Sequence, residues 1–311
     1  MKKISILIPT YNEEDNVNNV VERLEKILTE NLKNYDYEIV FIDNSSTDNT
    51  RNVLKDICSK YKNIKAIFNA KNFGFSRSTF YGLTQTTGDC TILIYADFQE
   101  PPELIPEFIK EWENGYKIVI GKKSKSKENP IMYIIRVMYY KLIKYISEIE
   151  HIDNFNGFGL YDKSFINVLR NLDDSEPYLR GIVAELGYDI KTIMYKHQKR
   201  EFGKTHFNFY KLYDHAMLGI TSYSKIVLRL STMFGFLSGI ITFILGIIVF
   251  IQKILYWDTY PFGMAALMVG VFFIGSVQLF FIGILGEYIL NINLRVMKRP
   301  LVVEKERINF E

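Results

Sequence analysis

The sequence predicts an α/β domain with a mostly parallel sheet, followed by two transmembrane helices. Over residues 1–121, short apolar runs alternate with stretches of helical periodicity, which is typical of parallel α/β sheets. Further along, two stretches without a charged residue, 233–251 and 262–286, follow each other closely. A length of 311 residues leaves room for one large domain and a membrane anchor.

Five apolar runs predict the strands, in the order 4–8, 37–42, 64–68, 91–95 and 118–120. Between the first two runs, apolar residues recur every three to four positions from Val17 to Leu28. This spacing predicts a helix over 17–32 with one buried face. The alternation then continues, so each strand is expected to return to the same sheet through a helix.

The two uncharged stretches are long enough to cross a bilayer. As helices that rise ~1.5 Å per residue, they would measure about 28 and 37 Å, against a hydrocarbon core of ~30 Å. A pair of buried core helices is the alternative interpretation. Basic residues flank the pair and are scarce between the stretches, so the positive-inside rule places both termini in the cytoplasm. Tyr256, Trp257 and Tyr260 in the connection fit an interfacial aromatic belt.

Composition narrows the class of protein. The formal net charge is only +3, which argues against nucleic acid as a partner. Two cysteines, Cys58 and Cys90, are too few for a disulfide framework and are expected to be buried and reduced. The apolar run after Lys2 and Lys3 is too short for a signal peptide. We divide the chain into an α/β domain (1–206), juxtamembrane interfacial helices (207–232), a transmembrane hairpin (233–286) and a cytoplasmic C-terminal tail (287–311).

Polar residues gather after three of the predicted strands, at 9–14, 43–48 and 96–103. In parallel α/β sheets, ligands bind beyond the carboxyl ends of the strands. Neither a G-x-G-x-x-G nor a G-x-x-x-x-G-K-[ST] loop follows any strand, which counts against a dinucleotide or P-loop enzyme. Phosphates then need another counter-charge, and a divalent metal at Asp97 would supply it. Helix caps and turns are the alternative interpretation of each cluster taken singly.

Each of two basic segments has two possible interpretations. The run 122–127 is either a solvated charge run or a phosphate contact through Lys123. Residues 130–147 place an apolar stripe at helical spacing beside basic residues. Such a helix lies either at the bilayer surface or on the sheet.

Five segments together resemble one known family. On these residues the chain resembles a family 2 glycosyltransferase of the polyprenyl-phosphate type, the group of dolichyl-phosphate mannose synthase and bacterial undecaprenyl-phosphate glucosyltransferases. The resemblance covers essentially the whole chain. The matching segments are 8–14, 43–50, 71–74, 96–103 and 112–116, with Gly121, Arg200 and Gly203.

The resemblance implies a GT-A (Rossmann-like) domain and inverting transfer of a sugar from a nucleotide sugar to polyprenyl phosphate. It implies Mg²⁺ or Mn²⁺ held by Asp97 and Gln99, and catalytic roles for Asp97, Asp153 and Arg200. The acceptor phosphate would be bound by Lys123, Arg200 and His206. The residues implied for nucleotide-sugar binding are Pro9, Tyr11, Glu13, Asp43, Lys71 and Asp97.

The chain departs from the family pattern at four places. Tyr95 replaces the first aspartate of an Asp-Ala-Asp motif, and Gly157 replaces the aspartate of a Gly-Asp-Phe segment, with Asp153 nearby. Residues 44–46 read Asn-Ser-Ser where Asp-Gly-Ser is usual, and His206 stands in a Ser-Lys-Tyr-like element. The absence of an aspartate at 157 does not exclude transfer, because the polyprenyl phosphate acceptor needs no general base. With a second pKa of ~6, a phosphate monoester is already mostly ionised at neutral pH.

The sequence therefore predicts an integral enzyme of a bacterial inner or plasma membrane. The resemblance implies transfer of a sugar to undecaprenyl phosphate at the cytoplasmic face. It favours UDP-glucose or UDP-N-acetylglucosamine over GDP-mannose as the donor, because the bacterial two-span members of the family commonly use UDP-sugars. A processive polysaccharide synthase and a non-catalytic, membrane-tethered nucleotide-sugar sensor are the alternatives. The sequence leaves open whether the chain forms a homo-oligomer.

Overall fold

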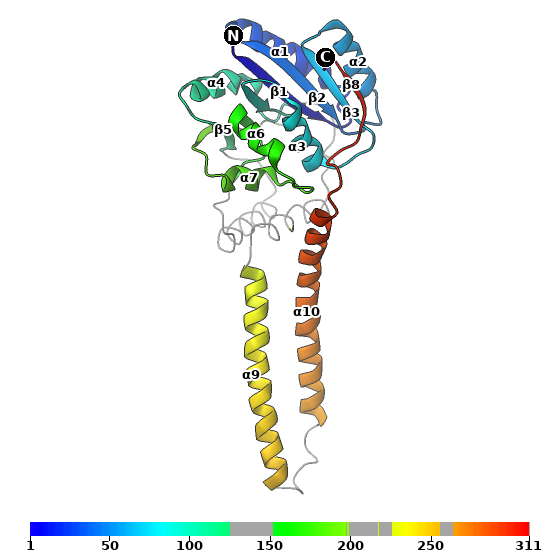
Figure 1. The fold of residues 1–311 in the computed structure, drawn as a ribbon, viewed down its shortest axis with the longest axis vertical. Helices are drawn as coiled ribbons and strands as arrows, with labels where there is room; N and C mark the ends of the chain where they lie inside the picture. The colour runs from blue at the N-terminus through cyan, green and yellow to red at the C-terminus, as the bar shows by residue number, and fades with distance from the viewer. Residues whose placement is uncertain (125–151, 197, 199–216, 218–225, 256–263, 311) are drawn as a thin grey trace.

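The computed structural model describes residues 1–124, 152–196, 198, 217, 226–255 and 264–310. An α/β domain carries two long helices that leave it at the end opposite the N-terminus (Figure 1). The strands are β1 (Lys3–Thr10), β2 (Asp36–Asp43), β3 (Ile64–Asn69), β4 (Cys90–Leu93), β5 (Ile118–Lys123), β6 (Gly159–Asp162), β7 (Ile190–Tyr195) and β8 (Glu304–Ile308). The helices are α1 (Val17–Asn31), α2 (Thr50–Lys60), α3 (Phe75–Gln85), α4 (Ile105–Glu113), α6 (Lys163–Asn171), α7 (Leu179–Glu185), α9 (Ile226–Leu255) and α10 (Met264–Val296).

The eight strands form one mixed sheet in the order β7-β5-β6-β4-β1-β2-β3-β8. Six of them run in the same direction, and β6 and β8 run antiparallel to their neighbours. The predicted α/β class is confirmed, although β6, β7 and β8 were not among the predicted strands. The carboxyl ends of the six parallel strands share one edge, which we call the carboxyl edge. Figure 1 shows β1 running from the N-terminus toward the long helices, so this edge faces them.

Helices cover both faces of the sheet. Alternate side chains of β1 point to opposite faces: Ile6 belongs to the core that also contains residues of α1, α2 and α4, and Leu7 to the core that contains residues of α3, α6 and α7. Both cysteines are buried and free, as predicted. Burial raises the pKa of Cys58 to about 11, which keeps this thiol protonated and unreactive at neutral pH.

Strand ends differ from the predicted ones where function is concerned. β2 continues through Asp43, and β4 ends at Leu93 rather than at Tyr95. Ile94 still donates its N–H to the carbonyl of Leu7 at 3.1 Å. Tyr95 and the polar residues after it therefore leave the sheet and pass over the carboxyl edge.

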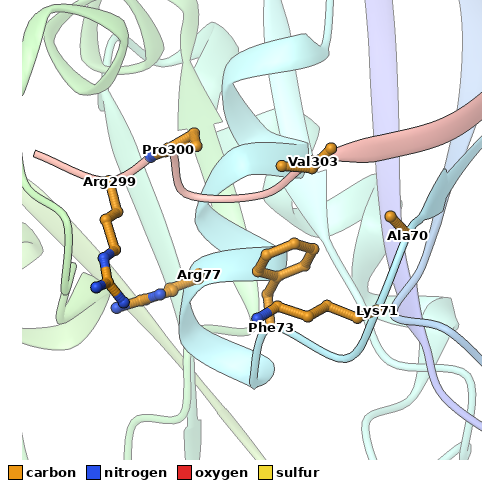
Figure 2. A pocket seen from close by; sticks show the side chains of 7 residues that line it. All are labelled: Ala70, Lys71, Phe73, Arg77, Arg299, Pro300 and Val303. Atoms are coloured by element: carbon orange, nitrogen blue, oxygen red, sulfur yellow. The ribbon is translucent and has the colours of Figure 1, made fainter.

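The C-terminal residues are part of the domain, and the predicted tail from 287 onward is wrong. α10 continues to Val296, and β8 pairs antiparallel with β3. The amide of Ala70 donates to the carbonyl of Val303 at 2.8 Å, and the Asn309 side chain donates to the carbonyl of Ile64 at 2.8 Å. We call residues 297–303 the C-terminal strap, which connects α10 to β8 beside the start of α3 (Figure 2).

The long helices expose apolar side chains. Among the described residues, one stretch, Phe273–Val296 of α10, is long and apolar enough to cross a membrane, and none of it is buried in the protein. The alternative of a buried core helix is therefore wrong for α10. A span in α9 stays a prediction, as do the boundaries at 206 and 232. The predicted interfacial segment 130–147 and the aromatic connection at 256–260 lie outside the described residues.

Candidate active site

Strained backbone clusters at the carboxyl edge. Four non-glycine residues there have positive φ: Asn12 (57°) after β1, Ser45 (66°) after β2, Phe98 (56°) after β4 and Asn154 (57°) before β6. A left-handed conformation is unfavourable for a bulky residue such as Phe98 and persists only where the surrounding structure holds it. Such strain is concentrated at functional sites, so it marks this edge as the candidate site.

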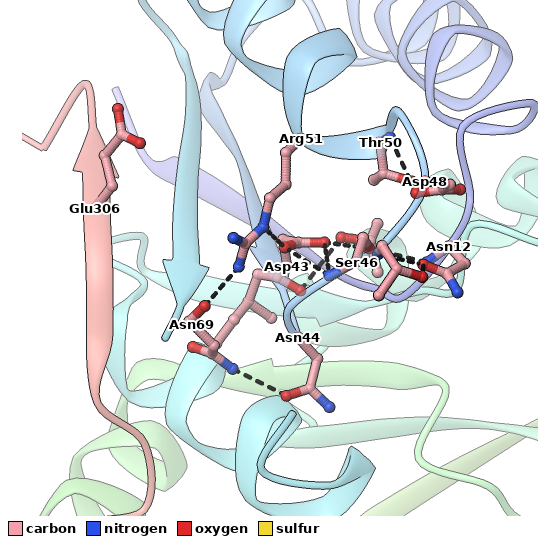
Figure 3. A network of polar contacts seen from close by, with 12 residues as sticks. Asn12, Asp43, Asn44, Ser46, Asp48, Thr50, Arg51, Asn69 and Glu306 are labelled. Carbon is pink, nitrogen blue, oxygen red and sulfur yellow. Dashed lines mark hydrogen bonds and ion pairs between the residues drawn. The ribbon is translucent and has the colours of Figure 1, made fainter. Parts of the chain in front are cut away.

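The loops after β1 and β2 hold each other. The Asn12 amide donates to Ser46 Oγ at 2.9 Å, and the Thr47 amide donates to Asn12 Oδ1 at 2.8 Å (Figure 3). The Glu13 amide donates to Thr50 Oγ1 at 2.9 Å. Beside these contacts the side chains of Pro9, Tyr11 and Glu13, predicted to bind the donor, are only partly buried.

Asp43 lies at the centre of this loop network. Its side chain is fully buried and accepts from the Arg51 Nε at 2.7 Å, as well as from the amide and hydroxyl of Ser46. Arg51 in turn donates to the carbonyl of Asn69 at 2.6 Å, which joins the ends of β2 and β3 (Figure 3). The geometry gives Asp43 a supporting role: together with Arg51 it holds the loop after β2, the start of α2 and the end of β3 together.

Asn44, the residue after Asp43, connects to the loop after β3. Its Oδ1 accepts from the Phe73 amide at 3.0 Å and from Asn69 Nδ2 at 3.2 Å, while its Nδ2 donates to Asn72 at 3.0 Å. We did not single out these amides from the sequence. The sequence did offer a signal for this contact: Asn44 departs from the family pattern, and the segment 71–74 matches it. Lys71 lies in this same loop, exposed beside the ring of Phe73.

Asp97 follows β4 in a tight turn that Phe98 makes possible. The Gln99 amide donates to Asp97 Oδ1 at 3.2 Å, and Phe98 is buried beneath the turn with the Arg23 guanidinium 5.1 Å from its ring. Asp97 is only 8% exposed. Gln99, the second predicted metal ligand, is partly buried beside it.

Glu100 is a second acidic group at this turn, and sequence analysis missed its role. The carboxylate accepts from Asn156 Nδ2 at 2.7 Å and from the Tyr195 hydroxyl at 3.2 Å, so it joins the ends of β4, β6 and β7. Burial, and then the charge of Asp97, raises the pKa of Glu100 to about 7. The sequence signal was an acidic residue three positions after Asp97, but charge there could equally have faced solvent.

Two further predicted residues approach this turn from β5 and β6. Lys123 ends β5, and its charge favours the ionised form of Glu100, lowering that pKa against the effect of burial. The Lys123 amide donates to the carbonyl of Asn154 at 3.3 Å, which places the turn containing Asp153 beside it.

The chain after β7 also reaches this turn. The Gln198 amide donates to the carbonyl of Gln99 at 3.1 Å. Arg200 and His206 lie outside the described residues.

Tyr95 and Gly157, two departures from the family pattern, meet in space. The Tyr95 hydroxyl donates to the carbonyl of Asn156 at 2.7 Å. A Cβ added to Gly157 would lie 3.0 Å from that hydroxyl oxygen, and the φ of Gly157 is +107°. Burial raises the pKa of Tyr95 well above its usual range, so the hydroxyl stays neutral and cannot replace a carboxylate. A larger residue at 157 conflicts with Tyr95, so we regard the two departures as one.

We expect Gly157→Ala to lower the free energy of unfolding by about 2 kcal/mol, because of its backbone conformation and its contact with Tyr95. Gly115→Ala is the matched control, since its φ is +104° and nothing lies within 4 Å of the added Cβ. Urea unfolding measures both variants: Gly115→Ala reports the cost of the backbone conformation alone, and the additional loss in Gly157→Ala reports the contact with Tyr95. In a Tyr95→Phe background, Gly157→Ala should cost about 1 kcal/mol less. Equal costs in both backgrounds would show that the two residues are independent.

The residues after β4 suit a divalent cation bound together with phosphate. Asp97 and Glu100 repel each other, and a cation would relieve that repulsion. Mg²⁺ typically takes one or two protein carboxylates and completes its coordination with phosphate and water. Among the described residues, no three His, Cys, Asp or Glu side chains form a metal-binding cluster.

The fold and the site define a class of enzyme. A Rossmann-like mixed sheet with an acidic turn after β4 and polar loops after β1, β2 and β3 is the arrangement of a GT-A glycosyltransferase. The model of the glycosyl transferase family 2 matches residues 5–170, more than half of the chain. The chain belongs to glycosyl transferase family 2.

Relatives match over nearly the full length. An uncharacterized glycosyltransferase of Synechocystis sp. is 33% identical over 99% of this chain and 96% of its own. The bactoprenol glucosyl transferase of Shigella phage SfX is 32% identical over 98% of this chain and 99% of its own. A prophage bactoprenol glucosyl transferase homolog of Escherichia coli is 31% identical over 97% of this chain and 98% of its own.

Solved structures align more distantly. Glucosyl-3-phosphoglycerate synthase from Mycobacterium tuberculosis, in complex with Mn²⁺, UDP and phosphoglyceric acid, covers 71% of this chain and 76% of its own. The TM-score is 0.48 and the sequence identity is 15%.

Proposed function

We propose that this protein is a membrane-bound, inverting glycosyltransferase. It transfers one sugar, glucose or N-acetylglucosamine from its UDP donor, to undecaprenyl phosphate at the cytoplasmic face. One observation carries the proposal: the acidic turn at Asp97 and the exposed apolar helix α10 occur in one chain, and the carboxyl edge faces the long helices. The relatives named bactoprenol glucosyl transferase, which match from end to end, support the same acceptor.

The donor would lie across the carboxyl edge. Pro9, Tyr11 and Glu13 would contact the nucleoside, with Asp43 holding the pocket wall behind them. Asp97 and Gln99 would hold a Mg²⁺ or Mn²⁺ ion, which would offset the charge of the donor diphosphate.

The acceptor would enter from the bilayer side. Lys123, Arg200 and His206 would bind its phosphate and bring an anionic oxygen to the anomeric carbon. The new bond to that carbon forms as the bond to the nucleoside diphosphate breaks, with inversion. The phosphate is already ionised, so the reaction depends on positioning and charge neutralisation rather than on a strong base. Asp153, beside Lys123, is the nearest candidate to assist.

Turnover with defined substrates tests the proposal. Purified protein would be incubated with radiolabelled UDP-glucose, UDP-N-acetylglucosamine or GDP-mannose and a short polyprenyl phosphate, followed by organic extraction. We expect label in the organic phase with a UDP-sugar, one sugar per lipid. Longer saccharides on the lipid would favour a processive synthase instead. Saturable donor binding without transfer would favour a nucleotide-sugar sensor.

We expect Asp43→Ala to raise the donor KM about 10-fold and to leave the acceptor KM unchanged, because the loop that Asp43 holds with Arg51 would open. Initial rates at varied donor and acceptor concentrations measure both constants. Asp56→Ala, an exposed substitution on α2, is the control. An effect confined to the acceptor KM would show that this pocket has been assigned to the wrong substrate.

A further inference from the structure

Arg180 is a basic residue at the carboxyl edge that the proposed function does not yet use. It lies in the first turn of α7, and Ile182 and Val183 of the same helix are buried in the core shared with α3 and α6. Figure 1 shows α7 at the end of the domain that faces the long helices. A cation in the first turn opposes the helix dipole, so helix stability does not account for an arginine here.

The guanidinium group of Arg180 is held beside the segment that precedes β6. Its Nη1 lies 3.5 Å from the carbonyl oxygen of Phe155, and its Cζ lies 5.2 Å from the ring of Tyr178, which is itself buried. Its charge also acts on Tyr95, where it lowers the pKa of the hydroxyl against the larger effect of burial. The cation is therefore close to the residues that follow β4.

Two positions near this cation are neutral where the family pattern has carboxylates. Tyr95 stays protonated because of burial, and residue 157 is a glycine. A Cβ added to Gly157 would lie 3.6 Å from the side chain of Leu179, so this position faces the start of α7. Neutral groups in place of two carboxylates make the surroundings of Arg180 more positive, which favours binding of an anion.

Lys123 contacts the same segment before β6. Its amide donates to the carbonyl of Asn154 at 3.3 Å, and Arg180 lies at Phe155, the next residue. Two basic residues, one from β5 and one from α7, therefore border this short segment. Such a pair suits a dianionic phosphate, which an arginine can contact through two parallel N–H groups.

The sheet order places Arg180 on the acceptor side of the Asp97 turn. β6, which follows the segment at Arg180, neighbours β4 on one side, whereas β1, β2 and β3, whose loops are assigned to the donor, lie on the other. Neighbouring strands are ~4.8 Å apart, so a phosphate between Arg180 and this turn stays within reach of a sugar held at Asp97. The attacking oxygen must approach the anomeric carbon to about 3 Å.

We propose that Arg180, together with Lys123, binds the phosphate group of the lipid acceptor and directs its attacking oxygen toward the donor sugar. The inference rests on the proposed function and adds to the acceptor site a residue that lies outside the family-matching segments. No bond to Arg180 forms or breaks in the reaction. The donor diphosphate has the same chemistry as the acceptor phosphate, so the test must separate these two sources.

Calorimetric binding of farnesyl phosphate, a short polyprenyl phosphate, to the full-length protein in neutral detergent micelles provides the test. We expect Arg180→Gln to raise the Kd about 10-fold, because it removes a charge-assisted contact to phosphate. Arg180→Lys, which keeps the charge but loses the two parallel donors, should raise it about three-fold. Lys60→Gln, an exposed substitution on α2 with the same charge change, should leave the Kd unchanged. The Kd of UDP in the presence of Mg²⁺ should be unchanged in all three variants.

Salt dependence distinguishes a phosphate contact from a structural role of Arg180. Salt screens a charge contact, so the wild-type Kd for farnesyl phosphate should rise more steeply with NaCl concentration than that of Arg180→Gln. Three results would overturn the inference: a wild-type Kd for Arg180→Gln, an equal rise in its Kd for UDP, or parallel salt dependence. The second would assign Arg180 to the donor diphosphate, and the third would leave it a structural role alone.

Sugar transfer by the wild-type protein in the same micelles separates this inference from the proposed function. Transfer without Arg180-dependent binding of farnesyl phosphate removes the assignment of Arg180 alone. Arg180-dependent binding without transfer removes the transferase alone.

Discussion

Asp97→Asn is expected to reduce sugar transfer at least 100-fold while leaving the protein folded. Charge stabilisation by a bound cation contributes several kcal/mol to a phosphate-displacement reaction, and Asp97 is the carboxylate best placed to hold that cation. Initial rates with radiolabelled UDP-sugar and polyprenyl phosphate measure the loss.

Folding of this variant should be unaffected for a structural reason. Asparagine keeps the Oδ1 atom that accepts from the Gln99 amide at 3.2 Å, so the turn at Phe98 retains its support. It also removes the repulsion between Asp97 and Glu100, so the thermal unfolding midpoint should stay equal or rise. Asp56→Asn is the control for an unspecific effect of charge. A near-wild-type rate for Asp97→Asn would return Asp97 to the role of a turn residue.

Removal of metal should have a matching effect on the wild-type protein. An excess of chelator should abolish transfer, and added Mg²⁺ or Mn²⁺ should restore it. UDP binding, followed by calorimetry, should weaken under the same chelation in the wild type but change little in Asp97→Asn. Full activity in excess chelator would remove the metal from the proposal and leave Lys123 and Arg200 to neutralise the diphosphate.

Glu38→Gln is expected to lower the free energy of unfolding by about 3 kcal/mol, the largest stability effect that we expect from one substitution. Glu38 on β2 is 1% exposed and pairs with Lys3 at 2.8 Å and Lys65 at 2.9 Å, so it joins β1, β2 and β3. It also accepts from Ser5 Oγ and from the Thr87 amide. Removing one partner of a buried ion pair leaves the others uncompensated. Urea unfolding in micelles, followed by tryptophan fluorescence, measures the loss, and Glu22→Gln on the exposed face of α1 is the control.

The same residue predicts how stability depends on pH. Burial alone would raise the pKa of Glu38, but hydrogen bonds from Lys3, Ser5 and Lys65 outweigh burial and lower the pKa to about 2. The unfolded chain has the higher pKa, near 4.5, and therefore binds a proton first as the pH falls. The contribution of Glu38 is fully present above pH 4.5 and is lost toward pH 2. The wild type should lose about 2 kcal/mol more than Glu38→Gln over this range, and parallel curves would contradict the assignment.

Sequence patterns located the loops of the site but not the contacts between them. Asp97 was recognisable because an acidic cluster follows an apolar strand. The importance of Glu100 was not, since its partners Asn156 and Tyr195 follow it by 56 and 95 positions. Asp43 was correctly placed at a strand end, yet its environment depends on Arg51 from α2 and on Ser46, which only packing brings to it.

By itself, the sequence determined the local features of this protein: an α/β alternation, polar loops after the parallel strands, an apolar helix near the C-terminus and membership of a family. These features follow from residue periodicity and from short motifs, which act over a few neighbouring positions. The tertiary structure alone decided that β8 completes the sheet, that Tyr95 occupies the space beside Gly157 and that the strap closes a basic pocket against α3. Each of these joins residues at least 60 positions apart, and such pairings depend on shape and burial in the folded chain, which no local pattern encodes.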